Sequence, residues 1–225
     1  SFEWGSSVST ASDGSVYIAG WTYGNLDGQF NSGNSDAFLA KYNADGSKAW
    51  TKLIGTTSSE RADSVSFASD GSIYIAGSTY GNLDGQNNSS GGSGDAFIAK
   101  YNSDGIKEWT KLLGLSSAVY PGYCVNTSSD GSVYIAGGDL NGQTNGGKID
   151  AFLAKYNSDG SNAWTQSFGT SYHDFANSVA ISDDGSIYVV GTTGEIFNNI
   201  SGKDAFLTKF NGDGSKAWTQ LLGSY

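Results

Sequence analysis

One short sequence occurs four times in this chain of 225 residues. It spans residues 13–20 as Asp-Gly-Ser-Val-Tyr-Ile-Ala-Gly, and close copies occupy residues 70–77, 130–137 and 184–191. A long and regular period of this kind indicates stacked copies of one supersecondary unit. A residue that recurs in every copy therefore serves the architecture of the repeat before it serves any chemistry.

Each copy predicts four short β-strands, because runs rich in β-branched and aromatic residues alternate with Gly, Asn, Asp and Ser. No stretch carries a sustained helical period, so we expect essentially no helix. The first strands are centred on Val8, Val65, Val125 and Val179. The second strands span residues 16–20, 73–77, 133–137 and 187–191, and the third span 37–42, 96–101, 151–156 and 205–210. The fourth strands start near Trp50, Trp109, Trp164 and Trp218.

Two Asp-Gly pairs mark the turns of each repeat, and Gly in such a pair supplies the positive φ of a tight hairpin. One pair joins the first strand to the second, and the other joins the third to the fourth. In an antiparallel meander these turns lie at one end of the sheet, whereas the longer and more variable connections lie at the other. Variable loops at one end of a regular scaffold are the usual place for binding. The pairs begin at Asp13, Asp70, Asp130 and Asp184, and at Asp45, Asp104, Asp159 and Asp213.

These features predict an all-β fold, a β-propeller built from four repeats of four antiparallel strands. A four-stranded unit of roughly 40–50 residues is the size of a propeller blade. The repeats either close as a four-bladed ring or form an arc of a larger propeller. We expect one β-propeller domain over residues 1–225, with blades at about residues 6–55, 63–114, 123–169 and 177–223.

The third strand and its neighbours resemble a known family. Residues 36–43 read Asp-Ala-Phe-Leu-Ala-Lys-Tyr-Asn and residues 74–81 read Tyr-Ile-Ala-Gly-Ser-Thr-Tyr-Gly. Both are similar to segments of the bacterial SBBP β-propeller repeat, and the resemblance extends over all four units, from about Val8 to Gly223. The resemblance implies a propeller in a secreted or surface protein, and it implies no catalytic residues that can be transferred to this chain.

Composition excludes several classes of partner. The net charge is −10 and Arg61 is the single arginine, so the basic stripe that a nucleic-acid binder needs is missing. An anionic membrane surface would repel the chain, and no apolar run approaches the ~20 residues of a membrane span. Cys124 is the only cysteine and has no partner for an internal disulfide. The chain has no Met, which predicts a processed or excised piece whose signal peptide or anchor would lie outside it.

The acidic residues fall mainly in the turns and at the start of the third strand, where we expect them to cap backbone N–H groups. Calcium is the one candidate cofactor. The sequence Asn-Leu-Asp-Gly-Gln at residues 25–29 recurs at 82–86, with a related form at 139–143. It places two oxygen-bearing side chains beside a sharp turn, and oxygen ligands are those that calcium prefers. The candidate ligands are Asn25, Asp27, Asn82, Asp84, Asp139 and Asn141. The alternative is a polar surface turn.

Aromatic residues near the long loops are the candidate ligand-binding residues. Trp21 is a better ligand candidate than the repeated tryptophans, because its equivalents in the other repeats are Ser78, Gly138 and Thr192. The candidate ligand-binding residues are Trp21, Tyr23, Tyr80, Tyr172 and Phe175. The other aromatic residues expected on the same loop face are Phe30, Tyr120 and Phe197. The four repeated tryptophans are expected in the core between blades. The repeated lysines are expected in ion pairs between blades with turn aspartates, and they are Lys41, Lys100, Lys155 and Lys209.

A catalytic site has weaker support. His173 is the only histidine, and with Asp174 and Ser171 close by in sequence it invites comparison with a hydrolytic triad, which needs separated segments that converge in space. We expect it to be a surface-loop residue. One His and one Cys are too few ligands for a zinc site, and a sialidase-like arginine cluster is missing. A glycosidase carboxylate pair leaves no spacing signature, and its candidates are Asp27, Glu60, Asp63, Asp84, Asp174 and Glu195.

The sequence therefore favours a secreted, non-enzymatic β-propeller module with a structural, adhesive or self-assembly role at the cell surface or in extracellular matrix. The alternative is a lectin-like, carbohydrate-binding propeller that uses its long loops, and a glycoside hydrolase is the third hypothesis. Expected partners are copies of the chain itself, other extracellular proteins or glycans. Nucleic acid and direct membrane insertion are not expected.

Overall fold

The chain folds into β-strands joined by turns, as the computed structural model describes it for residues 2–88, 94–114, 123–138, 149–194 and 204–223. These residues contain no helix, and so none that could cross a membrane. The first eight strands are β1 (Glu3–Thr10), β2 (Val16–Thr22), β3 (Asp36–Tyr42), β4 (Lys48–Ile54), β5 (Glu60–Phe67), β6 (Ile73–Thr79), β7 (Asp95–Tyr101) and β8 (Lys107–Leu113). The next eight are β9 (Cys124–Thr127), β10 (Val133–Gly138), β11 (Ala151–Tyr156), β12 (Asn162–Phe168), β13 (His173–Ile181), β14 (Ile187–Gly194), β15 (Asp204–Phe210) and β16 (Lys216–Leu222).

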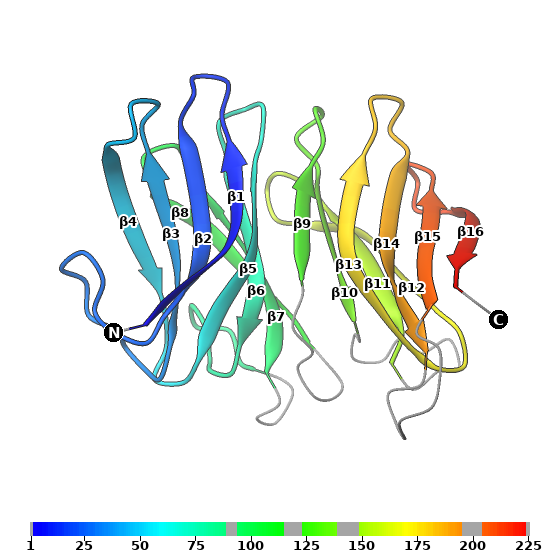
Figure 1. The fold of residues 1–225 in the computed structure, drawn as a ribbon, viewed down its shortest axis with the longest axis horizontal. Coiled ribbons are helices and arrows are strands. Elements are labelled where there is room, and N and C mark those ends of the chain that lie inside the picture. Colours follow the sequence, from blue (N-terminus) through cyan, green and yellow to red (C-terminus); the bar gives the residue numbers. More distant parts are fainter. Residues whose placement is uncertain (1, 89–93, 115–122, 139–148, 195–203, 224–225) are drawn as a thin grey trace. The chain divides into compact units, whose positions relative to one another are not determined.

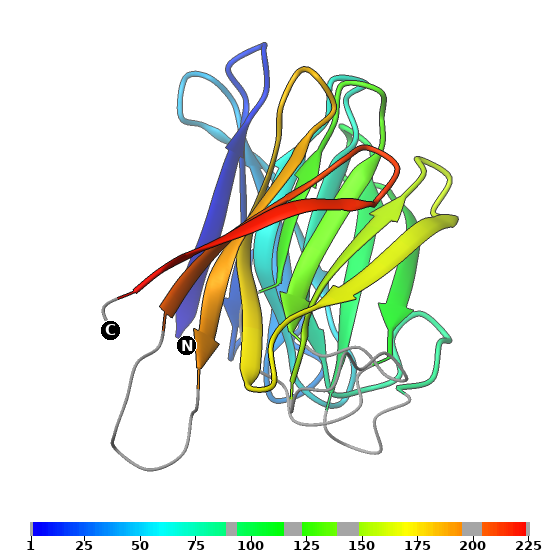
Figure 2. The same cartoon turned by 90° about the vertical axis from the view of Figure 1, so that its right-hand side faces the viewer.

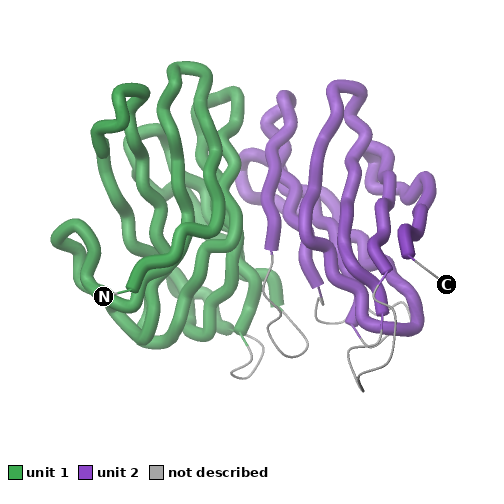
Figure 3. Tube along the Cα trace, in the orientation of Figure 1, with its two compact units in different colours: residues 1–121 green, residues 122–225 purple. Residues whose placement is uncertain are grey.

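The strands form four antiparallel sheets of four strands, each a meander in chain order (Figure 1). We call them the first sheet (β1–β4), the second (β5–β8), the third (β9–β12) and the fourth (β13–β16). The chain divides into two compact units, residues 1–121 and 122–225, and each unit contains two of the sheets (Figure 3). The expectation of an all-β fold of four repeats is thus confirmed, strand by strand.

The Asp-Gly turns have a common geometry. Each is a three-residue hairpin loop in which Gly alone takes a positive φ, for example 82° at Gly14. In that turn Gly14 N–H donates to the Ala11 carbonyl oxygen, and Ala11 N–H donates to the Ser15 carbonyl oxygen. In seven of the eight turns the Asp side chain also accepts the N–H of the serine two residues later, as Asp13 does from Ser15 at 2.9 Å. The predicted role of these aspartates is therefore confirmed.

The eighth turn shows what happens when that serine is missing. In the second sheet Ile106 stands at the serine position, and there Asn102 Oδ1 accepts the N–H groups of Asp104 and Ile106 in place of the aspartate. The turn keeps its shape because a different side chain satisfies the same backbone donors.

A β-bulge in the first strand of a repeat explains the glycine at the fifth position of the second strand. The register shifts between Ala62 and Ser64, and equivalent shifts occur in β1 and β13. The bulge places the Arg61 carbonyl oxygen where a side chain at Gly77 would stand, since an added Cβ would lie 1.9 Å from it. Gly20 and Gly191 face carbonyl oxygens in the same way. The glycine is needed at this position because backbone occupies the space that a Cβ would take.

Two faces of each sheet carry different repeated residues. The Tyr face of the first sheet consists of Tyr17, Ala19, Ala37, Leu39 and Ile54, and it packs in one core with the second sheet. The Val face of the second sheet consists of Val65, Ile73, Ile75, Phe97, Ala99 and Tyr101, and it forms the other side of that core. The second unit repeats the arrangement, because the Tyr face of the third sheet packs on the Val face of the fourth. Each unit thus contains one directional interface between a Tyr face and a Val face.

Candidate binding surface

The loops proposed for calcium are small hairpins of their own. Asp27 and Gly28 both have positive φ, 50° and 77°, and Leu26 and Gln29 exchange backbone hydrogen bonds across them at 3.0 Å. This is the geometry of a two-residue type I′ turn, in which an Asp-Gly pair is strongly favoured. Asp84 and Gly85 repeat it in the second sheet.

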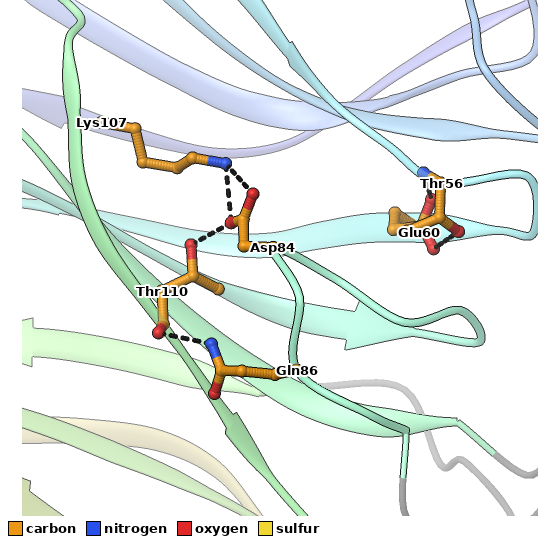
Figure 4. A network of polar contacts seen from close by, with 6 residues as sticks. All are labelled: Thr56, Glu60, Asp84, Gln86, Lys107 and Thr110. Atoms are coloured by element: carbon orange, nitrogen blue, oxygen red, sulfur yellow. Dashed lines mark hydrogen bonds and ion pairs between the residues drawn. The ribbon is translucent and has the colours of Figure 1, made fainter.

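Each hairpin is fastened to the outermost strand of its sheet (Figure 4). The Asp84 carboxylate accepts hydrogen bonds from Lys107 Nζ at 2.6 Å and from Thr110 Oγ1 at 2.5 Å. The Gln86 amide then donates to the Thr110 carbonyl oxygen and accepts from Leu112 N–H. The same contacts recur between the first hairpin and β4. The side-chain amide pairs with edge-strand backbone that would otherwise be open to another strand.

These contacts use the oxygen atoms that we considered as calcium ligands. A lysine ammonium group binds the carboxylates of Asp27 and Asp84, and the side-chain oxygens of Asn25 and Asn82 accept the N–H groups of Asn31 and Asn88. Among the described residues no three His, Cys, Asp or Glu side chains gather as a metal group. Asp139 and Asn141 lie outside the described residues. Calcium binding by these loops stays a prediction.

Burial alone would raise the pKa of Asp84, but the hydrogen bonds from Lys107 and Thr110 outweigh it and hold that pKa below its ordinary value. The carboxylate is therefore charged under ordinary conditions, and it faces the lysine charge at the surface of the sheet. These contacts therefore join the hairpin to the edge strand of the same repeat.

A second set of acids is buried near the long loops. Glu60 is fully buried, and its carboxylate accepts hydrogen bonds from Thr56 N–H, Thr56 Oγ1 and Thr79 Oγ1 at 2.6–2.8 Å. Figure 4 shows Glu60 with Thr56. Burial raises the pKa of Glu60 above its ordinary value against these hydrogen bonds, and the nearby Asp36 raises it further. In the second unit Asp174 accepts from Thr170 in the same way. These carboxylates hold the starts of β5 and β13 to the turns before them.

The aspartate that opens the Asp-Ala-Phe segment is also buried in the first three sheets, at Asp36, Asp95 and Asp150, and is half-buried in the fourth, at Asp204. The carboxylate of Asp36 fills the space beside Gly55, where an added Cβ would overlap it, and Asp204 does the same at Gly223. The glycine at the end of the fourth strand therefore makes room for the acid at the start of the third. Burial raises the pKa of Asp36 as well.

Trp21 differs from its expected position. It lies within β2 and is only 8% exposed, so it does not present a ring to solvent. The Arg61 guanidinium lies 4.6 Å from the centroid of its ring, and the Trp4 ring is nearly parallel to it, at 13° and 6.2 Å. Trp21 is therefore buried by two neighbours at the base of a larger cluster, and its role as a ligand contact stays a prediction.

That cluster is the most prominent exposed aromatic group of the first unit. Phe2, Trp4 and Tyr23 are each slightly more than half exposed, at 51%, 54% and 57%. Their ring centroids lie 5.1–6.2 Å from one another or from Trp21, within the range in which aromatic pairs attract. We call Phe2, Trp4, Trp21 and Tyr23 the aromatic cluster. Sequence inspection overlooked Phe2 and Trp4, because they precede the first clear strand and pair with Trp21 and Tyr23 only in the sheet.

The other aromatic candidates lie elsewhere. Tyr80 is partly exposed just after β6 in the first unit, whereas Tyr172 and Phe175 belong to the second unit. Tyr172 is exposed, but Phe175 is half-buried and its ring lies parallel to that of His173. His173 itself is buried at the start of β13, which corrects the expectation of a surface-loop histidine. Tyr120, Phe197 and Glu195 lie outside the described residues.

The second unit has a small pocket between its two sheets, lined by Phe168, Asp174, Thr193, Phe206, Thr208 and Thr219 among others. Its hydroxyl groups bond mainly to one another and to Asp174. Thr170 Oγ1 lies 3.1 Å from Thr193 Oγ1, and Thr208 Oγ1 lies 2.9 Å from Thr219 Oγ1. The polar groups of the pocket are therefore engaged with each other.

In each sheet the repeated tryptophan and the repeated lysine both lie against the repeated tyrosine of that sheet. Trp50 tilts against Tyr17, and Lys41 Nζ lies 5.6 Å from the centre of the same tyrosine ring. The arrangement recurs in all four sheets. Trp50 and Trp164 pack on the cores of their units, as expected for residues between blades. Trp218 is 38% exposed, which corrects that expectation for the fourth sheet.

The lysines were expected to pair with turn aspartates of a neighbouring blade. The aspartate that pairs with Lys155, at 3.8 Å, is Asp130, which belongs to the same sheet. Lys100 pairs with Glu108, also of its own sheet. The lysine lies along its own tyrosine and so reaches acids of its own repeat.

Comparisons with known proteins agree with the fold. The SBBP beta-propeller repeat matches residues 163–198, and a beta-propeller domain of unknown function, DUF5122, matches residues 11–48 and 68–105. The chain is 30% identical to the regulatory protein FlaEY of Caulobacter vibrioides over 81% of its own length, and it spans 21% of that relative.

Among solved structures, NanB sialidase of Streptococcus pneumoniae is similar over 84% of the chain and 27% of the sialidase, with a TM-score of 0.51 and 12% identity. A xylan β-1,4-xylosidase of Bacillus halodurans is similar over 94% of the chain and 42% of the enzyme, with a TM-score of 0.48 and 15% identity. At 12% identity the likeness to the sialidase concerns the fold alone.

Proposed function

We propose that this chain, whose residues 163–198 match the SBBP beta-propeller repeat, is a non-enzymatic module with a structural or adhesive role outside the cell or at its surface. One observation carries the proposal: four of the six acids that could have served catalysis, namely Asp27, Glu60, Asp84 and Asp174, are engaged in holding the repeat. Asp27 and Asp84 bind lysines of their own sheets, and Glu60 and Asp174 bind threonines of the adjoining turns. Residues used the same way in successive repeats serve the scaffold.

The extracellular setting is part of the same proposal. It is supported by the resemblance to repeats of secreted and surface proteins and by the strongly acidic composition, with a net charge of −10. Fractionation of the source cells, with detection by an antibody against this chain, tests it. We expect the chain in the extracellular or surface fraction, and recovery in the cytosol alone would refute this part of the proposal.

The absence of catalysis is tested with the purified chain and a panel of chromogenic glycosides, since a glycoside hydrolase is the competing hypothesis. We expect no turnover above that of a heat-denatured sample. Glu60→Gln and Asp174→Asn are the diagnostic variants. Turnover by the wild type that either substitution abolishes would overturn the proposal.

A second candidate function, carbohydrate binding, is favoured by the aromatic cluster. Three half-exposed rings rest on a buried tryptophan that an arginine backs, so they are held in place before a ligand arrives. Flat aromatic faces with polar neighbours suit the apolar faces of sugar rings. Glu3 and Asn25 are exposed polar residues close to these rings in sequence.

A glycan array tests this candidate, followed by titration of any glycan that binds. We expect Trp4→Ala to weaken binding about tenfold, which corresponds to about 1.4 kcal/mol. Phe30→Ala is the matched control, because Phe30 is an exposed aromatic residue of the same unit outside the cluster. An array without binding, or equal loss in both variants, would exclude the cluster as a glycan site.

A further inference from the structure

The outer faces of the first and fourth sheets carry the same apolar residues that are buried inside each unit. On the Val face of the first sheet Val8 is 64% exposed, whereas its equivalents Val65 and Val179 are each 5% exposed. Val16, Ile18 and Tyr42 on this face are half-buried, although Ile73, Ile75 and Tyr101 in the second sheet are almost fully buried. Phe38 and Ala40 on the same face are buried, at 8% and 5%, but within the first unit no described residue covers the β1 side of this face in the way that its equivalents are covered.

The fourth sheet shows the complementary face. On its Tyr face Leu222 is 79% exposed, whereas the equivalent Ile54 and Phe168 are 2% and 6% exposed. Val190 and Ala205 are exposed as well, at the positions of the fully buried Ala19 and Ala37. Figure 2 turns β14, β15 and β16 toward the viewer.

The interfaces inside the units determine what fits these two faces. In both units a Tyr face packs on a Val face, and in neither does a face meet its own kind. The first sheet offers a Val face and the fourth sheet a Tyr face, so the two are complementary. We propose that the Val face of the first sheet binds the Tyr face of the fourth sheet of a second copy of this chain, head to tail. This inference deepens the structural role proposed above and rests on it.

A polar contact of the internal interface has its counterpart at the proposed one. Within the first unit Val65 N–H donates to Ser7 Oγ at 3.2 Å, across the two sheets. The equivalent of Ser7 in the fourth sheet is Ser178, which pairs with Val190 as Ser7 pairs with Ala19, and it is exposed. In the proposed contact the N–H of Val8 donates to Ser178 of the second copy. The same backbone donor and serine acceptor thus recur.

A contact between unlike faces can continue from copy to copy, whereas a symmetric dimer uses the same face of both copies and stops there. Each copy that uses one face leaves its other face free, so association continues along a chain or closes as a ring. Substitution of a single face leaves the other face competent. Two variants altered on opposite faces can therefore complete one contact between them and no more.

Light scattering of the intact chain over a wide range of concentration tests the proposal. We expect the wild-type mass to rise above the single-chain value of 23.4 kDa as concentration increases. Val8→Asp alone and Leu222→Asp alone are each expected to remain at the single-chain mass. An equimolar mixture of the two variants is expected to form a species of twice that mass and nothing larger. The mixed dimer also shows that both variants fold.

Ile106→Asp is the matched control, because Ile106 is an exposed apolar residue in a turn of the second sheet, away from both faces. It is expected to associate as the wild type does. A wild type that stays at the single-chain mass at every concentration, or variants that associate unchanged, would overturn the proposal. Glycoside turnover by a chain that still assembles would refute the proposed function and leave this contact standing.

Discussion

At the scale of single residues, this protein uses charged groups mainly to fasten neighbouring segments. Lys107 and Asp84 join a hairpin to an edge strand. Glu60 accepts hydrogen bonds from Thr56, in the turn before β5, and from Thr79, in the neighbouring strand β6. The two acids have opposite pKa shifts because their surroundings differ. Hydrogen bonds from a lysine and a threonine prevail over burial at Asp84, whereas burial prevails at Glu60, which has only uncharged donors.

Asp84→Asn tests the hairpin fastening. Asn tolerates the positive φ of this position, so the change mainly removes the charge that faces Lys107. We expect a loss of about 0.5–1 kcal/mol in the free energy of unfolding at neutral pH. Because the folded-state pKa of Asp84 is lowered, its contribution is present above the ordinary pKa and disappears as pH falls through the folded value. Urea unfolding at neutral and acid pH measures the difference between variant and wild type.

The effect of calcium on thermal stability distinguishes an Asp84 that only pairs with Lys107 from an Asp84 that binds calcium. If Asp84 acts only as the partner of Lys107, calcium chloride leaves the thermal midpoint of the wild type unchanged. A rise in the wild type that Asp84→Asn lacks would instead establish the loop as a calcium ligand.

Glu60→Gln has the opposite pH dependence. The folded-state pKa of Glu60 is raised, so its contribution to stability is complete below the ordinary glutamate pKa of about 4.3 and is lost as pH rises through the folded value. We expect the stability of Glu60→Gln relative to wild type to increase between about pH 4 and about pH 7. Denaturant unfolding at both pH values measures it. Glu108→Gln, which removes a surface carboxylate, controls for net charge. A relative stability of Glu60→Gln that falls as pH rises would contradict the argument.

At the scale of elements, turns and bulges decide which glycines are essential. Gly71 has a positive φ of 88° in an open turn, where an added Cβ would meet nothing within 4 Å. Gly77 lies opposite the bulge of β5, where an added Cβ would overlap the Arg61 carbonyl group. Gly71 is needed for its positive φ, whereas Gly77 is needed because backbone atoms occupy the space that a Cβ would take.

The comparison of Gly77→Ala with Gly71→Ala tests this distinction. We expect Gly71→Ala to cost about 1 kcal/mol, the penalty of a left-handed conformation for an alanine. Gly77→Ala is expected to cost about 3 kcal/mol, because backbone must move in a packed sheet. Both values come from equilibrium unfolding of the same preparation. Equal costs would mean that the bulge relaxes without penalty.

At the scale of the whole molecule, charge and apolar surface act against each other. Copies that each carry a net charge of −10 repel, while the uncovered Val and Tyr faces favour contact. The balance depends on screening, since the Debye length falls from roughly 30 Å at 0.01 M salt to roughly 8 Å at 0.15 M.

Association of the wild type is therefore expected to strengthen with salt. Light scattering at low and at moderate ionic strength measures the effect, and Val8→Asp serves as the non-associating control. Dissociation of the assembly on addition of salt would show that ion pairs, and not apolar faces, hold the copies together.

The sequence by itself determined the repeat, its four strands and the chemistry of its turns. Those features depend on local preferences and on a period, both of which one chain displays directly. Asp13-Gly14 predicts a hairpin wherever it stands, because Gly adopts a positive φ without steric cost.

Only the tertiary structure decided which side chains meet. Trp21 looked like a loop residue, but pairing with Trp4 and stacking by Arg61, forty residues further along the chain, bury it. The pairing of Asp84 with Lys107, across the folded hairpin, could not be read from the sequence either. Val8 and Val65 occupy the same place in the repeat, and only packing distinguishes the exposed one from the buried one. Contacts between distant segments depend on how sheets stack, and the order of residues along one strand does not contain that information.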